Sequence, residues 1–100
     1  MKYSKLVRDK IPEIIKVNGG NPVTHIAEPH EYREKLAEKL VEEALKFKES
    51  GELGELADIL EVIDAICASQ FTTVAGVRVI QKRKAIERGK FRKKIILDEA

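Results

Sequence analysis

The chain has 100 residues, of which 43% are hydrophobic and 36% are charged, and its formal net charge is +2. This length fits one small domain, and apolar residues recur along most of the chain, which argues against disorder. No apolar run reaches the roughly 20 residues of a membrane span, and the first ten residues lack the apolar stretch of a signal peptide, so we expect a cytoplasmic protein with no membrane partner.

The first predicted helix starts near Asp9, which is a good N-cap, and it tolerates Pro12 in its first turn. The Asn-Gly-Gly sequence at 18–20 ends this helix. Residues 22–27 are rich in β-branched side chains and fit a short strand, which Pro29 ends.

Two central helices are predicted over about 31–49 and about 53–69, and the Ser-Gly pair at 50–51 separates them. We expect these helices to fold against each other as a hairpin. The later helix has one wide apolar face, formed by Leu56, Ile59, Leu60, Ile63, Ile66 and Cys67. The single cysteine is expected to be inert packing, and without a Cys/His cluster a zinc site is disfavoured.

The fourth predicted helix is capped by Thr72 or Thr73 and ends at Gly89. The tail, residues 91–100, fits an extended segment that pairs with the short strand before the second helix. The predicted fold class is mostly α: a four-helix fold with a central helical hairpin and one or two short strands, in a single domain over residues 1–100. A chain this short buries its hairpin best against a second copy, so we expect a homodimer or a higher homo-oligomer.

The acids of the later central helix fall into two groups on a helical wheel. Glu55 and Asp58 lie at the margin of the apolar face, whereas Glu61 and Asp64 fall opposite that face and are expected in solvent. On the preceding helix, Glu43 lies at the edge of the apolar stripe and is expected to face the first pair across the hairpin. Three converging carboxylates would repel one another, and a divalent cation such as Mg²⁺ removes that repulsion.

Ordinary surface salt bridges are the alternative explanation for these acids. Lys39 and Glu43 are spaced i,i+4 on one helix, as are Glu42 and Lys46, and such pairs need no metal. The pattern alone leaves both interpretations open.

Four motifs resemble the MazG-type all-α nucleotide pyrophosphohydrolases. The family signature is a helix with E-E-x-x-E followed by a helix with E-x-x-D, and "KLVEEALKF" at 39–47 and "ELADIL" at 55–60 occupy those places. The opening "YSKLVRDKIPEII" at 3–15 and the ending "KAIERGKFRKKI" at 84–95 resemble a small subgroup described as phosphoribosyl-ATP pyrophosphohydrolase-like. The resemblance covers nearly the whole chain and is weakest over 72–82.

This resemblance implies an all-α nucleotide pyrophosphatase-like fold and a Mg²⁺ cofactor, with Mn²⁺ as a substitute. The expected metal ligands are Glu42, Glu43, Glu55 and Asp58, and the last three are also the expected catalytic residues. The resemblance further implies that water attacks a nucleotide at the α–β phosphate link, which releases a monophosphate and pyrophosphate. Lys46 stands where the family has its third glutamate, which leaves the number of ions and the activity itself open. The family also implies a homodimer.

Five basic residues are predicted to bind substrate phosphates, namely Lys5, Arg8, Lys46, Lys84 and Arg88. Alternatives stay open for most of them. Arg8 could instead pair with a neighbouring element and fix the N-terminus, and Lys84 and Arg88 could form a solvated basic face near a helix end.

Three functions remain open at this point. The first is Mg²⁺-dependent hydrolysis of a nucleoside triphosphate or a relative, with phosphoribosyl-ATP itself less favoured because the match is to the "-like" subgroup. The second is a non-catalytic nucleotide-binding or interaction module on the same scaffold, which Lys46 motivates. The third is nucleic-acid binding through the basic residues of 78–94, which the small net charge and few aromatic residues disfavour.

Overall fold

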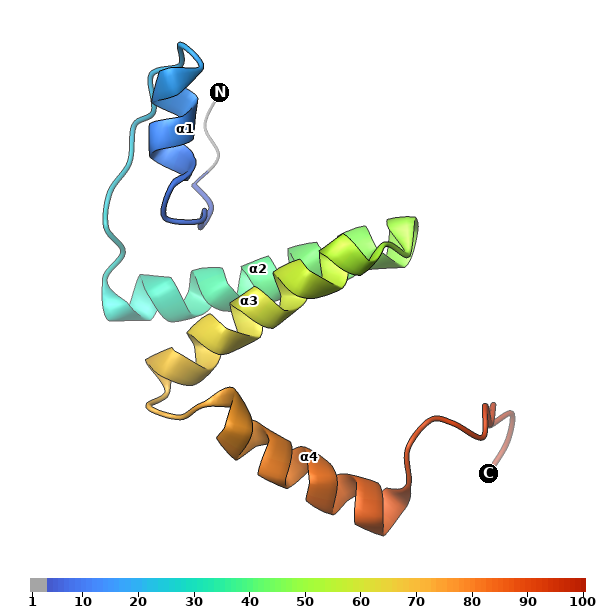
Figure 1. Cartoon of the computed structure of the whole chain (residues 1–100). Coiled ribbons are helices and arrows are strands. Elements are labelled where there is room, and N and C mark those ends of the chain that lie inside the picture. Colours follow the sequence, from blue (N-terminus) through green and yellow to red (C-terminus); the bar gives the residue numbers. More distant parts are fainter. Residues whose placement is uncertain (1–3) are drawn as a thin grey trace.

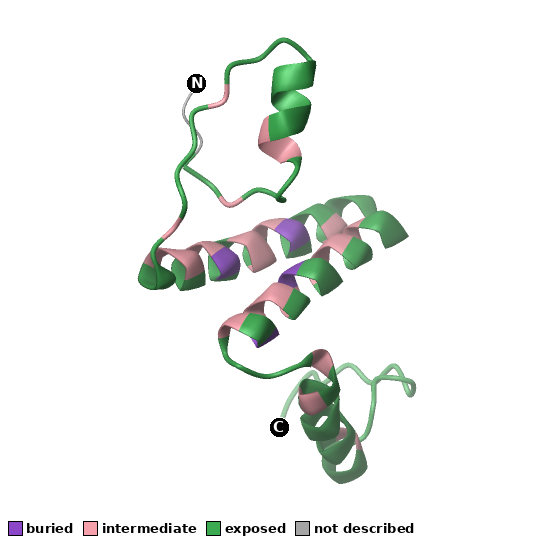
Figure 2. Cartoon of the chain, turned by 60° about the vertical axis from the view of Figure 1, so that its left-hand side comes forward, coloured by how far each residue is buried: buried purple, intermediate pink, exposed green. Residues whose placement is uncertain are grey.

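The computed structural model describes residues 4–100 and consists of four helices joined by short connections (Figure 1). The helices are α1 (Ile11–Val17), α2 (Pro29–Ser50), α3 (Leu53–Ser69) and α4 (Val74–Arg88). The mostly α fold class is therefore confirmed. No strand occurs within residues 4–100, so the strands predicted for 22–27 and 91–100 are wrong. The two segments lie on opposite sides of the hairpin in Figures 1 and 2, and neither has a partner for strand hydrogen bonds.

The two long helices, α2 and α3, pack side by side as the predicted hairpin (Figure 1). Gly51 adopts the left-handed conformation, with φ of 66°, and its N–H donates to the Phe47 carbonyl oxygen at 2.8 Å. The predicted break at 50–51 is confirmed. The α2 helix begins at Pro29 rather than near 31, because proline at the first helical position lacks only an N–H that would be unpaired there.

All four buried residues within 4–100 belong to this hairpin (Figure 2). Leu36 and Glu43 come from α2, and Val62 and Cys67 come from α3. The predicted apolar face of α3 was partly wrong, because Val62 is buried while 52% of Leu60 is exposed. A wide apolar face does not indicate which of its sides meets the neighbouring helix, and here α2 covers the side that also carries two acids.

The short helix α1 has no buried residue and packs against no other helix within the described chain. It begins at Ile11 with Lys10 as its N-cap, so the predicted cap at Asp9 is wrong. Without a side-chain cap, the first turn relies on backbone contacts, including the bond from the Ile11 N–H to the Arg8 carbonyl oxygen at 3.1 Å.

The last helix, α4, leaves the end of α3 at an angle of 105° and also has no buried residue. The Thr73 hydroxyl accepts from the Gly76 N–H at 3.2 Å, which confirms one of the two predicted caps. Gly89 ends the helix as predicted. No single helix within residues 4–100 is long and apolar enough to cross a membrane, and α3 and α4 meet that criterion only as a bent pair, by length and composition.

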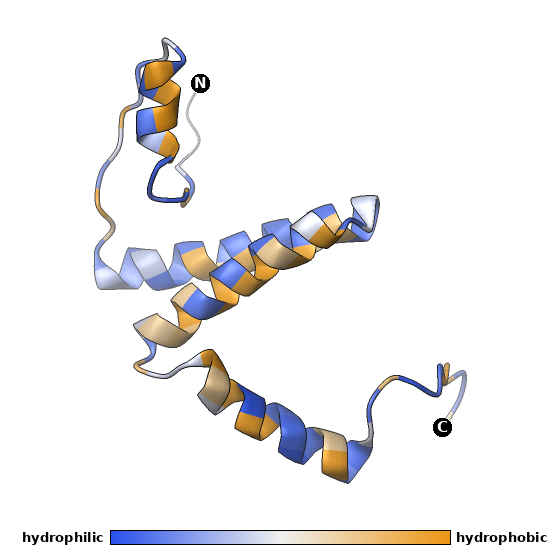
Figure 3. Ribbon diagram, in the orientation of Figure 1, coloured by the Kyte–Doolittle hydropathy of each residue, from blue (hydrophilic) through white to orange (hydrophobic). Residues whose placement is uncertain are grey.

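The described chain is open for its length and exposes much apolar surface. Its radius of gyration is 17.5 Å, against about 13 Å for a compact domain of 100 residues. Figure 3 shows hydrophobic residues along α1, α3 and α4, and many of these residues are exposed. The most exposed apolar side chains of the second half include Leu53, Phe71, Ile86, Phe91 and Leu97.

Candidate metal centre

Three acids from the two central helices converge on the hairpin. Glu43 comes from α2, and Glu55 and Asp58 come from the first two turns of α3. One carboxylate oxygen from each lies within 4.8 Å of the others. Glu55 and Asp58 are half-buried, because their three-residue spacing keeps both on the side of α3 that meets α2. Glu61 and Asp64 are exposed, as predicted.

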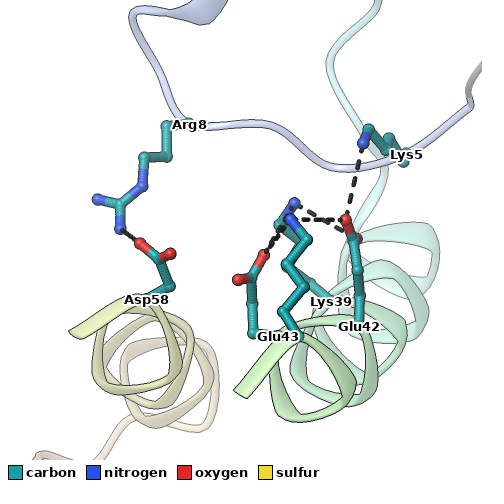
Figure 4. Close-up of polar contacts among 7 residues, drawn as sticks. Lys5, Arg8, Lys39, Glu42, Glu43 and Asp58 are labelled. Atoms are coloured by element: carbon teal, nitrogen blue, oxygen red, sulfur yellow. Dashed lines mark hydrogen bonds and ion pairs between the residues drawn. The ribbon is translucent and has the colours of Figure 1, made fainter. Parts of the chain in front are cut away.

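Glu43 is the buried member of this cluster, with 3% of the residue exposed. Its Oε1 lies 3.4 Å from both Lys39 Nζ and Lys46 Nζ. Its Oε2 is buried and has no hydrogen-bond partner within residues 4–100. In Figure 4 this second oxygen lies on the side that faces Asp58. A buried carboxylate oxygen without a donor is costly, and a cation among the three acids would satisfy it.

Glu42 occupies a different environment from its neighbour and is not one of the three convergent acids. Three lysines surround it: Lys39 and Lys46 lie 3.4 Å from its carboxylate oxygens and Lys5 lies 3.7 Å away (Figure 4). Burial by itself would raise the pKa of Glu42, but these three positive charges lower the pKa below its usual value. Of the four predicted metal ligands, the structure thus brings together three, and it surrounds the fourth with ammonium groups.

Lys46 lies between the two adjacent glutamates of α2. Its Nζ is 3.4 Å from Glu42 Oε1 and 3.4 Å from Glu43 Oε1. The hydrogen bond to Glu42, followed by the charge of Glu43, raises the pKa of this lysine above its usual value. Both i,i+4 pairs considered from the sequence are present, so ordinary salt bridges do engage these glutamates. These salt bridges do not involve Glu55, which has no ion pair within residues 4–100.

The N-terminal segment lies over the same acids (Figure 4). Arg8 Nη2 donates to Asp58 Oδ1 at 2.8 Å, and 56% of the arginine side chain and 40% of the aspartate side chain are exposed. The alternative in which Arg8 pairs with a neighbouring element is therefore the one observed. Sequence patterns gave no signal for this pair, because its members are 50 residues apart.

The two basic residues predicted on the last helix lie elsewhere. Lys84 and Arg88 are exposed, and their side chains make no hydrogen bond or ion pair within residues 4–100. The α4 helix leaves the hairpin at the C-terminal end of α3, whereas Glu55 and Asp58 lie near the N-terminal end of that helix (Figure 1). Within residues 4–100, Lys84 and Arg88 therefore lie on a different part of the fold from the three acids, and their predicted phosphate binding stays a prediction.

Comparisons with known proteins do not identify a relative. No protein-family model matches the chain, and the searches of curated proteins and of solved structures find no match. The resemblance to the nucleotide pyrophosphohydrolases therefore stays a prediction from the motifs of the sequence.

Proposed function

We propose that this protein is a Mg²⁺-dependent nucleotide pyrophosphohydrolase. It would hydrolyse a nucleoside triphosphate, or a related nucleotide, at the α–β phosphate link to a monophosphate and pyrophosphate. The observation that carries this proposal is the buried, unpartnered Oε2 of Glu43 beside the carboxylates of Glu55 and Asp58. A cluster of hard oxygen donors with one unsatisfied buried oxygen fits Mg²⁺ or Mn²⁺ better than it fits any side chain nearby.

The residues have distinct roles in this proposal. Glu43 is the fixed ligand, because burial and two lysines restrict its carboxylate. Glu55 and Asp58 are half-buried ligands on the more open side, where the phosphates of a nucleotide can approach. The bound ion would neutralise phosphate charge and lower the pKa of the attacking water. With its three lysine contacts, Glu42 is an electrostatic support for this site rather than a ligand.

The lysines around Glu42 favour a site for one ion. A family member with a third glutamate at position 46 would offer a further carboxylate, whereas this chain supplies an ammonium group there. That ammonium is half exposed and can contact a phosphate oxygen as a point charge. The ammonium group of Lys46 would thus supply part of the positive charge that a further metal ion would otherwise supply.

A homodimer is the second part of the proposal. The radius of gyration and the exposed apolar side chains of α3 and α4 indicate surface that a second copy would bury. Leu53 and Leu60 lie on the side of α3 turned away from the buried Val62, so a second hairpin could pack against that side.

The direct test is pyrophosphate release from standard and modified nucleoside triphosphates, with Mg²⁺, with Mn²⁺ and with EDTA. We expect metal-dependent release that Asp58→Asn reduces by about 100-fold or more, since even the loss of an outer-shell partner typically costs 10–100-fold. Asp64→Asn is the matched control, because it makes the same change on an exposed face of the same helix and should keep full activity. Absence of release from every nucleotide by the folded wild-type protein would contradict hydrolysis.

A non-catalytic nucleotide-binding or interaction module is the second candidate. It is favoured by one specific observation, the number of basic side chains already paired with these acids. Equilibrium binding of a labelled nucleotide separates the two functions, because tight Mg²⁺-dependent binding without pyrophosphate release would support the module.

A further inference from the structure

The N-terminal segment, residues 4–10, is joined to the acids of the hairpin by two ion pairs. Arg8 contacts Asp58 at 2.8 Å, and Lys5 contacts Glu42 at 3.7 Å. The helix that follows packs against no other helix of the described chain. We term this segment the N-terminal arm. Its Leu6 is half-buried, and its other residues are exposed. Charge therefore contributes much of the attachment of the arm.

Arg8 and a divalent cation would require the same carboxylate. Asp58 belongs to the group of three acids whose oxygens lie within 4.8 Å of one another, and it is also the acceptor of the Arg8 bond. Two positive groups on one carboxylate repel each other. The Arg8 bond is the more exchangeable interaction, because the guanidinium is 56% exposed and uses one nitrogen rather than its two-pronged fork.

The lysines of α2 differ from Arg8 in this respect. Lys39 and Lys46 contact Glu43 from three or four residues away on the same helix, so the helix itself keeps them close. Arg8 reaches Asp58 from 50 residues away, on a segment that lies outside the two packed helices. Of the cations paired with the three convergent acids within residues 4–100, Arg8 is therefore the one that does not belong to the hairpin itself.

We propose that the N-terminal arm is an exchangeable phosphate-binding arm: Arg8 neutralises Asp58 until a divalent cation binds, and then moves to the phosphate anion at that cation. This inference rests on the proposed function and adds an order of binding, metal first and nucleotide second. A guanidinium suits the second role because its planar fork matches the oxygens of a phosphate. Lys5, on the same arm, would follow Arg8 from Glu42 to the anion.

The first experiment measures the binding of Mn²⁺ alone by electron paramagnetic resonance. We expect Arg8→Met to bind Mn²⁺ up to about fivefold more tightly than the wild type, because an exposed ion pair no longer competes. Lys10→Met is the matched control, since it removes one positive charge from the same segment and this lysine makes no ion pair within residues 4–100. An equal gain in Mn²⁺ affinity in both variants would indicate a general charge effect and would overturn the proposed exchange of Arg8.

The second experiment measures the binding of inorganic pyrophosphate at saturating Mn²⁺ by calorimetry. We expect Arg8→Met to weaken pyrophosphate binding by about tenfold, the usual loss for one hydrogen bond to a charged group. Arg8→Lys should lose less, because it keeps the charge without the fork. Unchanged pyrophosphate affinity in Arg8→Met would overturn the inference.

The two proposals fail in different ways. If the folded wild type binds no Mn²⁺, the metal centre itself is wrong and the arm falls with it. If the wild type binds Mn²⁺ while Arg8→Met leaves Mn²⁺ affinity unchanged or weaker, only the exchange is overturned and the metal centre stands.

Discussion

The central hairpin and the segments that flank it differ in what holds them in place. The hairpin of α2 and α3 contains all four buried residues of the described chain, whereas α1, α4 and the tail contain none. The hairpin is thus stabilised by packing within one chain. The flanking segments, α1, α4 and the tail, depend instead on ion pairs, on helix caps and on any surface that packs against them. The three convergent acids lie on the packed part, and Arg8, for which we propose exchange, lies on the N-terminal flank.

This difference bears on function as well as stability. The proposed metal site would need ligands with fixed positions, and the packing of α2 against α3 would hold Glu43 and Asp58 in this way. The proposed exchange of Arg8 between Asp58 and a phosphate would need a more exposed position, and 56% of the Arg8 side chain is exposed.

The largest expected effect is a loss of stability when a packed side chain is removed, measured against the removal of an exposed one. Leu36→Ala should lower the free energy of unfolding by about 2–5 kcal/mol, because the buried leucine leaves a cavity. Ile86→Ala, at a residue that is 78% exposed, should change it by less than about 0.5 kcal/mol. Urea unfolding at low protein concentration, followed by circular dichroism, measures both values.

The same pair of variants can break the comparison. If Ile86→Ala costs as much as Leu36→Ala, and stability rises with protein concentration, then α4 is buried against a second copy. The flanks would then be part of a dimeric core rather than exposed segments, and the homodimer would be supported.

The next effect is the stabilisation of the hairpin by the metal. Mg²⁺ at 100 times its dissociation constant should raise the free energy of unfolding by about 2.7 kcal/mol, provided that only the folded chain binds it. Glu43→Gln should abolish this gain, because it removes the charge of the buried ligand. EDTA should reverse the gain in the wild type. Thermal unfolding with and without Mg²⁺ measures it.

A matched variant on the same hairpin controls for this result. Glu61→Gln makes the same chemical change at an exposed acid and should keep the full Mg²⁺ effect. A Mg²⁺ gain that survives in Glu43→Gln would show that the ion binds elsewhere and would remove the candidate metal centre.

Local sequence signals predicted the hairpin and its acids correctly, because both depend on neighbours within one helix or turn. The break at 50–51, the cap at Thr73 and the shared face of Glu55 and Asp58 each follow from a few adjacent residues. Contacts between distant segments were not predictable in this way. The partner of Arg8 depends on where the chain returns, and nothing in the local pattern encodes that position.

The smallest expected effect is a pH dependence within the hairpin. The pKa of Glu42 is lowered, so its ion pairs stabilise the fold above its ordinary value of 4.5 and are lost as the pH falls through the lowered pKa. The pKa of Lys46 is raised, so its contribution is complete below its ordinary value of 10.5 and is lost as the pH rises through the raised pKa. Lys46→Met should therefore cost at most about 1 kcal/mol, since the lysine is half exposed.

The shape of the pH curve distinguishes this ion-pair effect from a general change in charge. The stability difference between wild type and Lys46→Met should be constant between about pH 5 and pH 10 and should shrink on both sides of that range. Lys82→Met, on the exposed helix α4, removes the same charge without an ion pair and should show no such plateau. Chemical unfolding across this pH range measures both differences. A plateau of equal height in Lys82→Met would mean that net charge, rather than pairing with the glutamates of the hairpin, determines the effect.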